Sequence, residues 1–290
     1  MKFKFAEMNF AIVAAGQCWI TEKFYLEDMF DILKDKLDDS YVFIVGRSND
    51  KQETQQLINE IEPGKKNILI LLSDEAGIIP SYKDKFDFIF RTYNRKDLYD
   101  NNKIFAIPCG YGTSMRFSYN ISDFNSKEFV KKDLKDREYD LFYSGQISPN
   151  RVELLNNLNN IKDRFKSLVK FTDGFGKGFT LEEFYNNLNN TKIALVPNGA
   201  VVPESFRYFE AIRSGAIVIT TYPKWMDAYN HWYYDESPAI FINSWNELTV
   251  DFVNNILINT DFEDYQIRNE KYFNEKISPN GLANYILERV

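Results

Sequence analysis

Histidine and cysteine are scarce in this chain of 290 residues, which contains one histidine, His231, and two cysteines, Cys18 and Cys109. Zinc sites usually draw several ligands from these two residue types, so we do not expect a zinc enzyme. A catalytic triad built on histidine could use His231 alone. At most one disulfide can form, and such low cysteine use is typical of a reducing compartment.

An excess of positive charge and a long hydrophobic run are also missing. Lysine and arginine number 35 against 42 aspartate and glutamate residues, which gives a formal net charge of −7. Nucleic-acid-binding domains are usually basic, so we expect no nucleic-acid partner. The apolar run Phe10–Ala15 is too short for a signal peptide, and no run approaches the roughly 18 residues of a membrane span. We therefore expect a soluble, cytoplasmic protein with no membrane partner.

The residues that are present suit a folded protein, because 44% are hydrophobic and 27% are charged. Short apolar runs alternate with stretches of helical spacing. Continuous apolar strands separated by helices indicate a parallel sheet covered on both faces. In the first half, the expected strands are Phe10–Ala15, Tyr41–Gly46, Asn67–Leu72, Phe86–Arg91 and Lys103–Pro108, and the expected helices are Glu22–Asp39 and Lys51–Glu62.

A second series of the same kind follows the polar segment Ser118–Glu138, which we interpret as a linker with a surface helix. The tail Asp261–Val290 is expected to be helical in two pieces, with a break near Pro279–Gly281. The expected strands of this series are Tyr139–Ser144, Ser167–Phe171, Lys192–Pro197, Ala216–Thr221 and Ala239–Ile242, and its helices are Arg151–Ile161, Leu181–Asn190, Ser205–Ser214 and Trp245–Ile258.

The two series predict an α/β protein with two Rossmann-like, doubly wound domains facing a central cleft. We place these domains at residues 1–125 and 126–275. A final helix over residues 276–290 can pack back on the first domain. Open α/β sheets bind ligands beyond the carboxyl ends of their strands, so the loops that follow strands are where site residues are expected.

The stretch Thr191–Pro223 carries the clearest site pattern. A buried strand leads to a loop, and Pro203 precedes a helix that Ser205 is expected to cap. A helix start attracts anions through its free N–H groups and its dipole, and Arg207 adds a permanent positive charge. Glu210, three residues further on, could accept hydrogen bonds from both hydroxyls of a ribose. Arg207 and Glu210 could equally form an ordinary surface ion pair, since this layout is common in α/β proteins.

This stretch resembles the C-terminal half of the exostosin-like glycosyltransferases, a family with the two-Rossmann-domain GT-B fold. The segment Arg137–Arg151 looks like the start of the family's donor domain, with a strand, a glycine turn and an arginine on the next helix. In the first half, LLSDEAG, IFRTYNR and IFAIPCGYG are loosely similar to short members encoded by large DNA viruses of algae. The residues that carry the main resemblance are Val196-Pro197-Asn198-Gly199, Ser205-Phe206-Arg207, Glu210-Ala211-Ile212, Gly215 and Ile217-Val218-Ile219.

The resemblance implies a transferase that moves a sugar from a UDP-sugar to a glycan hydroxyl, with no metal or other cofactor. The first domain would bind the acceptor, an oligosaccharide or glycoprotein glycan, and the second would bind the nucleotide sugar. Glu210 would hold the ribose. Ser205, Arg207, Gly145 and Arg151 would meet the diphosphate. Among sugars, the resemblance favours xylose.

A catalytic base is also implied, because the exostosin-like family is considered inverting and an inverting transfer needs a base for the acceptor hydroxyl. The first domain has no histidine, so aspartate or glutamate is the expected base. Asp74 and Glu75 follow the expected strand Asn67–Leu72, and we prefer Asp74. An acidic pair after a strand is also a common turn feature.

Other functions stay open. A GDP-sugar enzyme of the fucosyltransferase-like type also has Ala-x-x-x-Gly before an apolar strand, as at Ala211–Gly215. A catalytically inactive module would bind a nucleotide or glycan without turnover. A two-domain binding protein of the periplasmic type is disfavoured because we find no signal peptide. Arg91 and Tyr93 are weaker candidates for the cleft, and the aromatic residues between Trp225 and Tyr234 are expected to pack.

Overall fold

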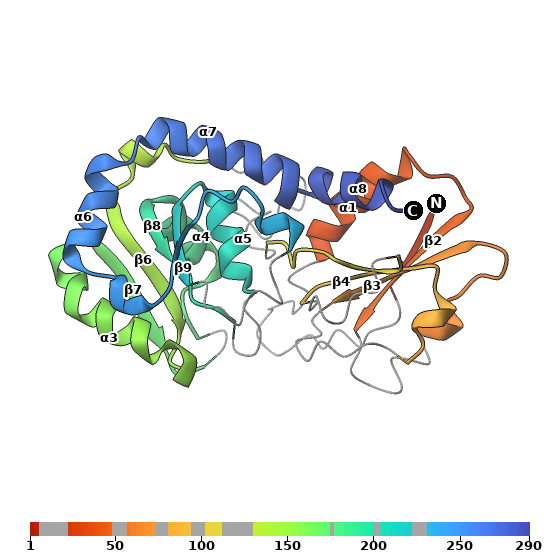
Figure 1. The fold of residues 1–290 in the computed structure, drawn as a ribbon, viewed down its shortest axis with the longest axis horizontal. Helices are drawn as coiled ribbons and strands as arrows, with labels where there is room; N and C mark the ends of the chain where they lie inside the picture. Colours follow the sequence, from red (N-terminus) through yellow and green to blue (C-terminus); the bar gives the residue numbers. More distant parts are fainter. Residues whose placement is uncertain are drawn as a thin grey trace. The chain divides into compact units, whose positions relative to one another are not determined.

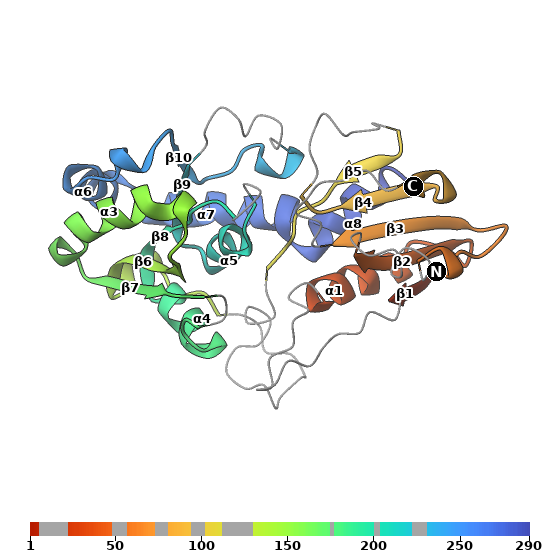
Figure 2. The ribbon, with the colours of Figure 1, turned by 90° about the horizontal axis from the view of Figure 1, so that it is seen from below.

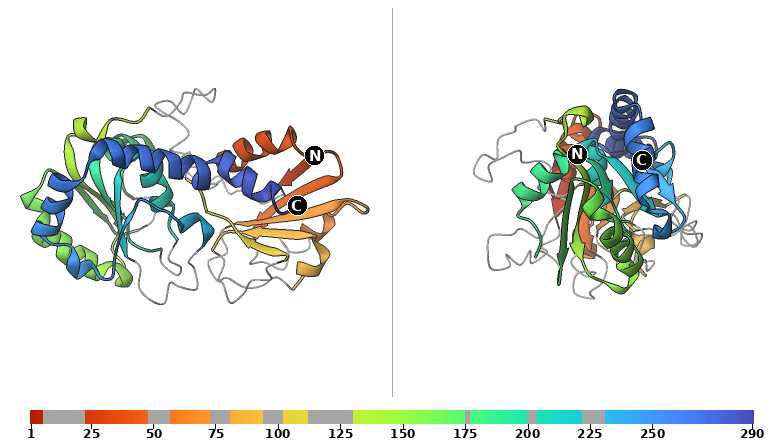
Figure 3. Two further views of the ribbon diagram at one scale, coloured as in Figure 1. Left: turned by 45° about the horizontal axis from the view of Figure 1, so that its top comes forward. Right: turned by 90° about the vertical axis from the view of Figure 1, so that its left-hand side faces the viewer.

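The computed structural model divides the chain into two compact units, each built around one five-stranded sheet (Figure 1). The first unit contains Met1–Gly110, Ala228–Asp235 and Glu275–Val290, and the second contains Tyr111–Asp227 and Glu236–Asn274. Both termini therefore belong to the first unit (Figure 3). The structure describes residues 1–5, 23–47, 57–72, 81–93, 102–111, 130–174, 177–199, 204–221 and 231–290.

The sheet of the first unit is parallel, and its strands follow each other in chain order. The expected strand Phe10–Ala15 lies outside the described residues, whereas the short strand Lys2–Phe5 was not anticipated. The other four expected strands are confirmed within two residues at each end. The strands are β1 (Lys2–Phe5), β2 (Tyr41–Arg47), β3 (Lys66–Leu72), β4 (Phe88–Arg91) and β5 (Ile104–Ala106).

Two helices from opposite ends of the chain pack together beside this sheet (Figures 1 and 2). They are α1 (Lys23–Lys34) and α8 (Pro279–Leu287). The ring of Phe30 in α1 packs edge-on against that of Phe43 in β2, with centroids 5.5 Å apart. The ring of Tyr285 in α8 lies 6.4 Å from that of Phe90. The C-terminal helix is therefore part of the core of the first unit.

The aromatic segment near His231 packs in the same unit. The ring of Trp232 stacks on that of Tyr285, with centroids 4.0 Å apart and planes 8° apart. Its indole N–H donates to the carbonyl oxygen of Ala106 at 2.9 Å. His231 itself is buried, with 2% of its surface exposed. The described part of this segment thus contributes packing, as the sequence indicated, and Trp225 lies outside the described residues.

The sheet of the second unit is parallel and has the order β10-β9-β8-β6-β7. The strand order reverses next to β6, because β7 lies on one side of it and β8 on the other. This reversal is the switch point of a doubly wound sheet. All five expected strands are present, as β6 (Tyr139–Gln146), β7 (Ser167–Thr172), β8 (Thr191–Leu195), β9 (Ile217–Thr221) and β10 (Ile240–Ile242).

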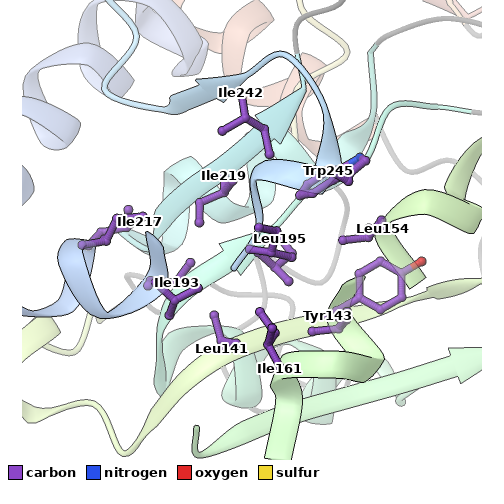
Figure 4. Close-up of a cluster of buried hydrophobic side chains, with 14 of the residues drawn as sticks. Leu141, Tyr143, Leu154, Ile161, Ile193, Leu195, Ile217, Ile219, Ile242 and Trp245 are labelled. Carbon is purple, nitrogen blue, oxygen red and sulfur yellow. The ribbon is translucent and has the colours of Figure 1, made fainter. Parts of the chain in front are cut away.

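Helices cover both faces of this second sheet, because successive side chains of a strand point to opposite faces. On one face, Leu141 and Tyr143 of β6 join a buried cluster with α3 (Val152–Ile161) and α6 (Val250–Asn259) (Figure 4). On the other face, Phe142 contacts Phe184 of α4, with ring centroids 5.2 Å apart. The second face is covered by α4 (Leu181–Asn189) and α5 (Phe206–Ser214).

One expected element takes a different form. Residues 130–138 of the predicted surface helix contain only the 3₁₀ turn Leu134–Asp136, and the rest of that segment lies outside the described residues. Arg137 is 3% exposed because its guanidinium donates to the carbonyl oxygens of Lys132, Thr191 and Ser214. These bonds tie this segment to the amino end of β8 and to the end of α5, so it is an inner part of the unit.

Residues 245–290 are helical largely as expected. The predicted helix Trp245–Ile258 is divided into the 3₁₀ turn Trp245–Glu247 and α6, which Thr249 caps. The tail forms α7 (Phe262–Tyr272), a π-helical turn (Phe273–Ile277) and α8, whose first residue is Pro279. The remaining 3₁₀ turns are Lys83–Lys85, Pro149–Arg151, Lys162–Arg164 and Trp232–Tyr234. In the described part of the chain, no helix is long and apolar enough to span a membrane.

Candidate functional site

The carboxyl ends of β6 and β8 meet at the switch point of the second sheet, and the loops that follow them are joined by hydrogen bonds. The side-chain amide of Asn150 donates to the carbonyl oxygen of Gly199 at 2.8 Å. The guanidinium of Arg151 donates to the carbonyl oxygen of Asn198 at 3.3 Å. Ligands of open α/β sheets bind at this position, because no crossover connection covers the edge between two strands whose connections lead in opposite directions.

Gly145 lies where a tyrosine and an arginine come together. A Cβ atom added at Gly145 would stand 2.9 Å from the hydroxyl oxygen of Tyr143 and 3.1 Å from Nη1 of Arg151. Only glycine leaves room for both groups at their present positions. Burial raises the pKa of the Tyr143 hydroxyl above its ordinary value, while the positive charges of Arg151 and Arg207 act in the opposite direction. Both arginines therefore act on the same hydroxyl.

Helix α5 begins at this edge with the cap that the sequence predicted. The Oγ atom of Ser205 accepts a hydrogen bond from the backbone N–H of Arg207 at 3.3 Å. At the other end, Gly215 adopts a left-handed conformation with φ of 74°, which ends the helix before β9. The positive end of the α5 dipole therefore points to the same edge as Arg151.

Arg207 is held by two contacts and remains partly accessible. Its Nη1 donates to Oε2 of Glu210 at 2.6 Å. Its guanidinium carbon lies 3.8 Å from the centroid of the Phe184 ring, a cation–π contact. The side chain of Arg207 is 43% exposed, whereas that of Glu210 is 4% exposed. The ion pair that the sequence left open is thus present, with a buried carboxylate that orients a half-exposed cation.

All five predicted site residues of the second series lie at this edge or on the helix that starts there: Gly145, Arg151, Ser205, Arg207 and Glu210. Asp74 and Glu75 lie outside the described residues. Sequence reasoning missed Tyr143, although it shares a strand face with Gly145 two residues later. It also missed Phe184, for which the sequence carries no local signal.

The weaker candidates of the first unit are buried. Arg91 ends β4 and is 0% exposed, and Tyr93 is 4% exposed. Tyr93 also has a positive φ of 54°, an uncommon conformation for a residue with a side chain. Among the residues that the structure describes, no three histidine, cysteine, aspartate or glutamate side chains gather in a way that could hold a metal ion.

Comparison with known proteins gives matches to solved structures only. No protein-family model and no curated protein sequence matches the chain. The structure is similar to that of an α1,3-fucosyltransferase, with a TM-score of 0.51 and 10% identity over 100% of this chain and 88% of that one.

Two further similar structures have lower scores. One is TarM of S. aureus, solved in complex with UDP, with a TM-score of 0.49 and 14% identity over 91% of this chain and 58% of that one. The other is the UDP-forming α,α-trehalose-phosphate synthase of Burkholderia vietnamiensis, with a TM-score of 0.48 and 11% identity over 91% of this chain and 76% of that one.

The similarity bears on the fold alone, because the identities are low. Only the α1,3-fucosyltransferase among these three structures has a TM-score above 0.5, so the assignment of the fold uses that structure. Together with the two parallel sheets, it confirms the predicted α/β, GT-B fold class.

Proposed function

We propose that this protein is a glycosyltransferase that moves a sugar from a UDP-sugar to a glycan hydroxyl. The observation that carries the proposal is that Arg151 and the start of α5, which bears Arg207, both lie at the switch point of the second sheet. Two permanent cations and a helix start form a site for a doubly charged group such as a diphosphate. A nucleotide sugar carries that group at the bond that breaks.

Each residue then has a distinct role. Arg151, Arg207 and the N–H groups at Ser205 bind the diphosphate, and they stabilise the negative charge that develops on it as the sugar leaves. Glu210 binds the ribose hydroxyls through its carboxylate. Gly145 leaves room for the diphosphate-binding arginine beside β6. These roles need no metal, in keeping with the expectation of a cofactor-free enzyme.

The acceptor side of the proposal comes from the sequence. Asp74 or Glu75 takes the proton of the acceptor hydroxyl, and the transfer inverts the configuration of the sugar. The exostosin-like pattern of Ser205-Phe206-Arg207 and Glu210-Ala211 supports a UDP donor, with xylose as the favoured sugar. A GDP-sugar is the second candidate, because Ala211 and Gly215 before β9 also fit the fucosyltransferase-like pattern.

A nucleotide panel tests the proposal. We expect UDP and UDP-sugars to raise the melting temperature of the protein, while GDP, CMP and ADP leave it unchanged. A ligand at about 100 times its Kd adds about 2.7 kcal/mol to the free energy of unfolding, which is readily measured. A shift with GDP compounds alone would favour the second candidate. Binding without turnover would indicate an inactive module, and no shift with any nucleotide would contradict the proposal.

Replacing Glu210 with glutamine distinguishes its two possible roles, which are to bind the ribose and to orient Arg207. The glutamine amide oxygen can still accept from Arg207, but the carboxylate for the ribose is lost. A hydrogen bond to a charged group contributes about 1.5–3 kcal/mol, so we expect UDP to bind at least about tenfold more weakly. Binding of inorganic pyrophosphate should stay unchanged, as measured by calorimetry. An equal loss for pyrophosphate would show that Glu210 acts only by orienting Arg207.

A further inference from the structure

Two buried hydrogen-bond donors meet at the carboxyl end of β6. Within the described residues, the hydroxyl of Tyr143 and Nε of Arg151 are both inaccessible to solvent and have no hydrogen-bond partner of acceptable geometry. Buried polar groups in folded proteins are nearly always paired, so an exception needs an explanation. Both atoms belong to residues that occupy the space where a Cβ atom on residue 145 would lie.

The backbone alone holds Arg151 loosely. Its Nη1 donates to the carbonyl oxygen of Gln146 at 3.5 Å, and its Nη2 to that of Asn198 at 3.3 Å. Both distances exceed the 2.7–3.2 Å of ordinary N–H···O bonds. The position of its guanidinium therefore depends mainly on the side chains that pack against it. The Tyr143 hydroxyl also lies beside the guanidinium, next to Gly145, and it is held rigid because Tyr143 is 1% exposed within the core cluster of α3 and the sheet.

We infer that Tyr143 is a positioning residue, which orients the Arg151 guanidinium toward the phosphate group that the function proposed above places at this edge. The hydroxyl limits where the guanidinium can lie, and Gly145 permits their close approach. A correctly placed guanidinium offers two parallel N–H donors to one phosphate. A displaced one contributes only its charge.

Substituting Tyr143 by phenylalanine tests this role, because it removes one oxygen and keeps the ring in the core. We expect the affinity for UDP to fall about fivefold, the usual contribution of one hydrogen bond, because a displaced guanidinium loses one of its two bonds to the phosphate; uridine binding should stay unchanged. A merely structural role would change both ligands alike. Tyr185→Phe is the matched control, since this residue of α4 is also 1% exposed and its hydroxyl donates to the carbonyl oxygen of Val130.

A double-mutant cycle then shows whether Tyr143 acts through Arg151. In the Arg151→Ala background, Tyr143→Phe should have no further effect on UDP binding, since the group that it positions is gone. Additive losses would overturn the inference. So would an unchanged affinity of the Tyr143→Phe single variant in a wild-type background that binds UDP.

Inorganic pyrophosphate distinguishes failure of this inference from failure of the proposed function. If the wild-type protein binds pyrophosphate but no nucleotide, and Tyr143→Phe weakens that binding, the positioning role holds and the nucleotide-sugar donor is wrong. If the wild-type protein binds neither pyrophosphate nor any nucleoside diphosphate, both are overturned.

Discussion

Replacing Arg207 with alanine is expected to weaken nucleoside diphosphate binding by about thirtyfold or more. The guanidinium is oriented by Glu210 and by the Phe184 ring, and the side chain is still 43% exposed at the edge where α5 begins. Removing one partner of a hydrogen-bonded charge pair costs about 2–5 kcal/mol, and each 1.4 kcal/mol corresponds to about tenfold in affinity. Titration calorimetry with UDP measures the loss directly.

The same substitution also affects folding, because it leaves the buried Glu210 carboxylate without its arginine. Arg207→Lys keeps a cation beside Glu210 but lacks the planar pair of donors, so we expect an intermediate affinity with a near-normal melting temperature. Arg268→Ala on α7 is the charge-matched control, since Arg268 pairs with Asp264 and both side chains are more than half exposed. If the Arg207→Ala protein folds and binds UDP with wild-type affinity, the edge where α5 begins is not the donor-binding site.

Replacing Asp74 with asparagine is expected to lower kcat by about a hundredfold to ten-thousandfold, the usual contribution of a general base. Nucleotide binding should stay at the wild-type level, because the donor residues belong to the second unit. Asp74 follows the last residue of β3, Leu72, by two positions. The measurement is initial-rate kinetics with the UDP-sugar that the nucleotide panel identifies.

Two companion variants make this result specific. Glu75→Gln should have a small effect if Asp74 is the base, and reversed effects of the two variants would transfer the role to Glu75. Asp84→Asn in the exposed 3₁₀ turn Lys83–Lys85 is the control for loss of one negative charge in the same unit. Full turnover by both Asp74→Asn and Glu75→Gln would exclude this acidic pair as the source of the base.

Secondary structure was predictable where local pattern decides it. Buried strands of a parallel sheet are apolar on both faces, so β3 and β9 stand out as continuous runs such as Ile68–Leu72 and Ile217–Ile219. Ser205 and Gly215 mark the two ends of α5 because a cap and a left-handed turn depend on one residue each. The strand Lys2–Phe5 was missed because four alternating residues are too short to be distinctive.

Some of the site was predictable for the same reason. Arg207 and Glu210 are three residues apart on one helix, so their contact follows from helix geometry. Gly145 and Arg151 were identified through the family resemblance, and their proximity was not deducible from spacing. Arg137 was expected on a surface helix, yet it is buried because its partners are carbonyl oxygens of Thr191 and Ser214, far away in the sequence.

Of the ten strands in the described part of the chain, the sequence by itself determined nine. It also determined the α/β class and the start of α5, because these depend on side-chain pattern over a few neighbouring residues. Only the tertiary structure decided the strand order that places a switch point next to β6. It also decided that Tyr143 and Arg151 come close together beside Gly145, and that the Arg207 guanidinium packs on the Phe184 ring. These features join segments far apart in the chain, and their geometry is set by how helices and strands pack, which no local pattern encodes.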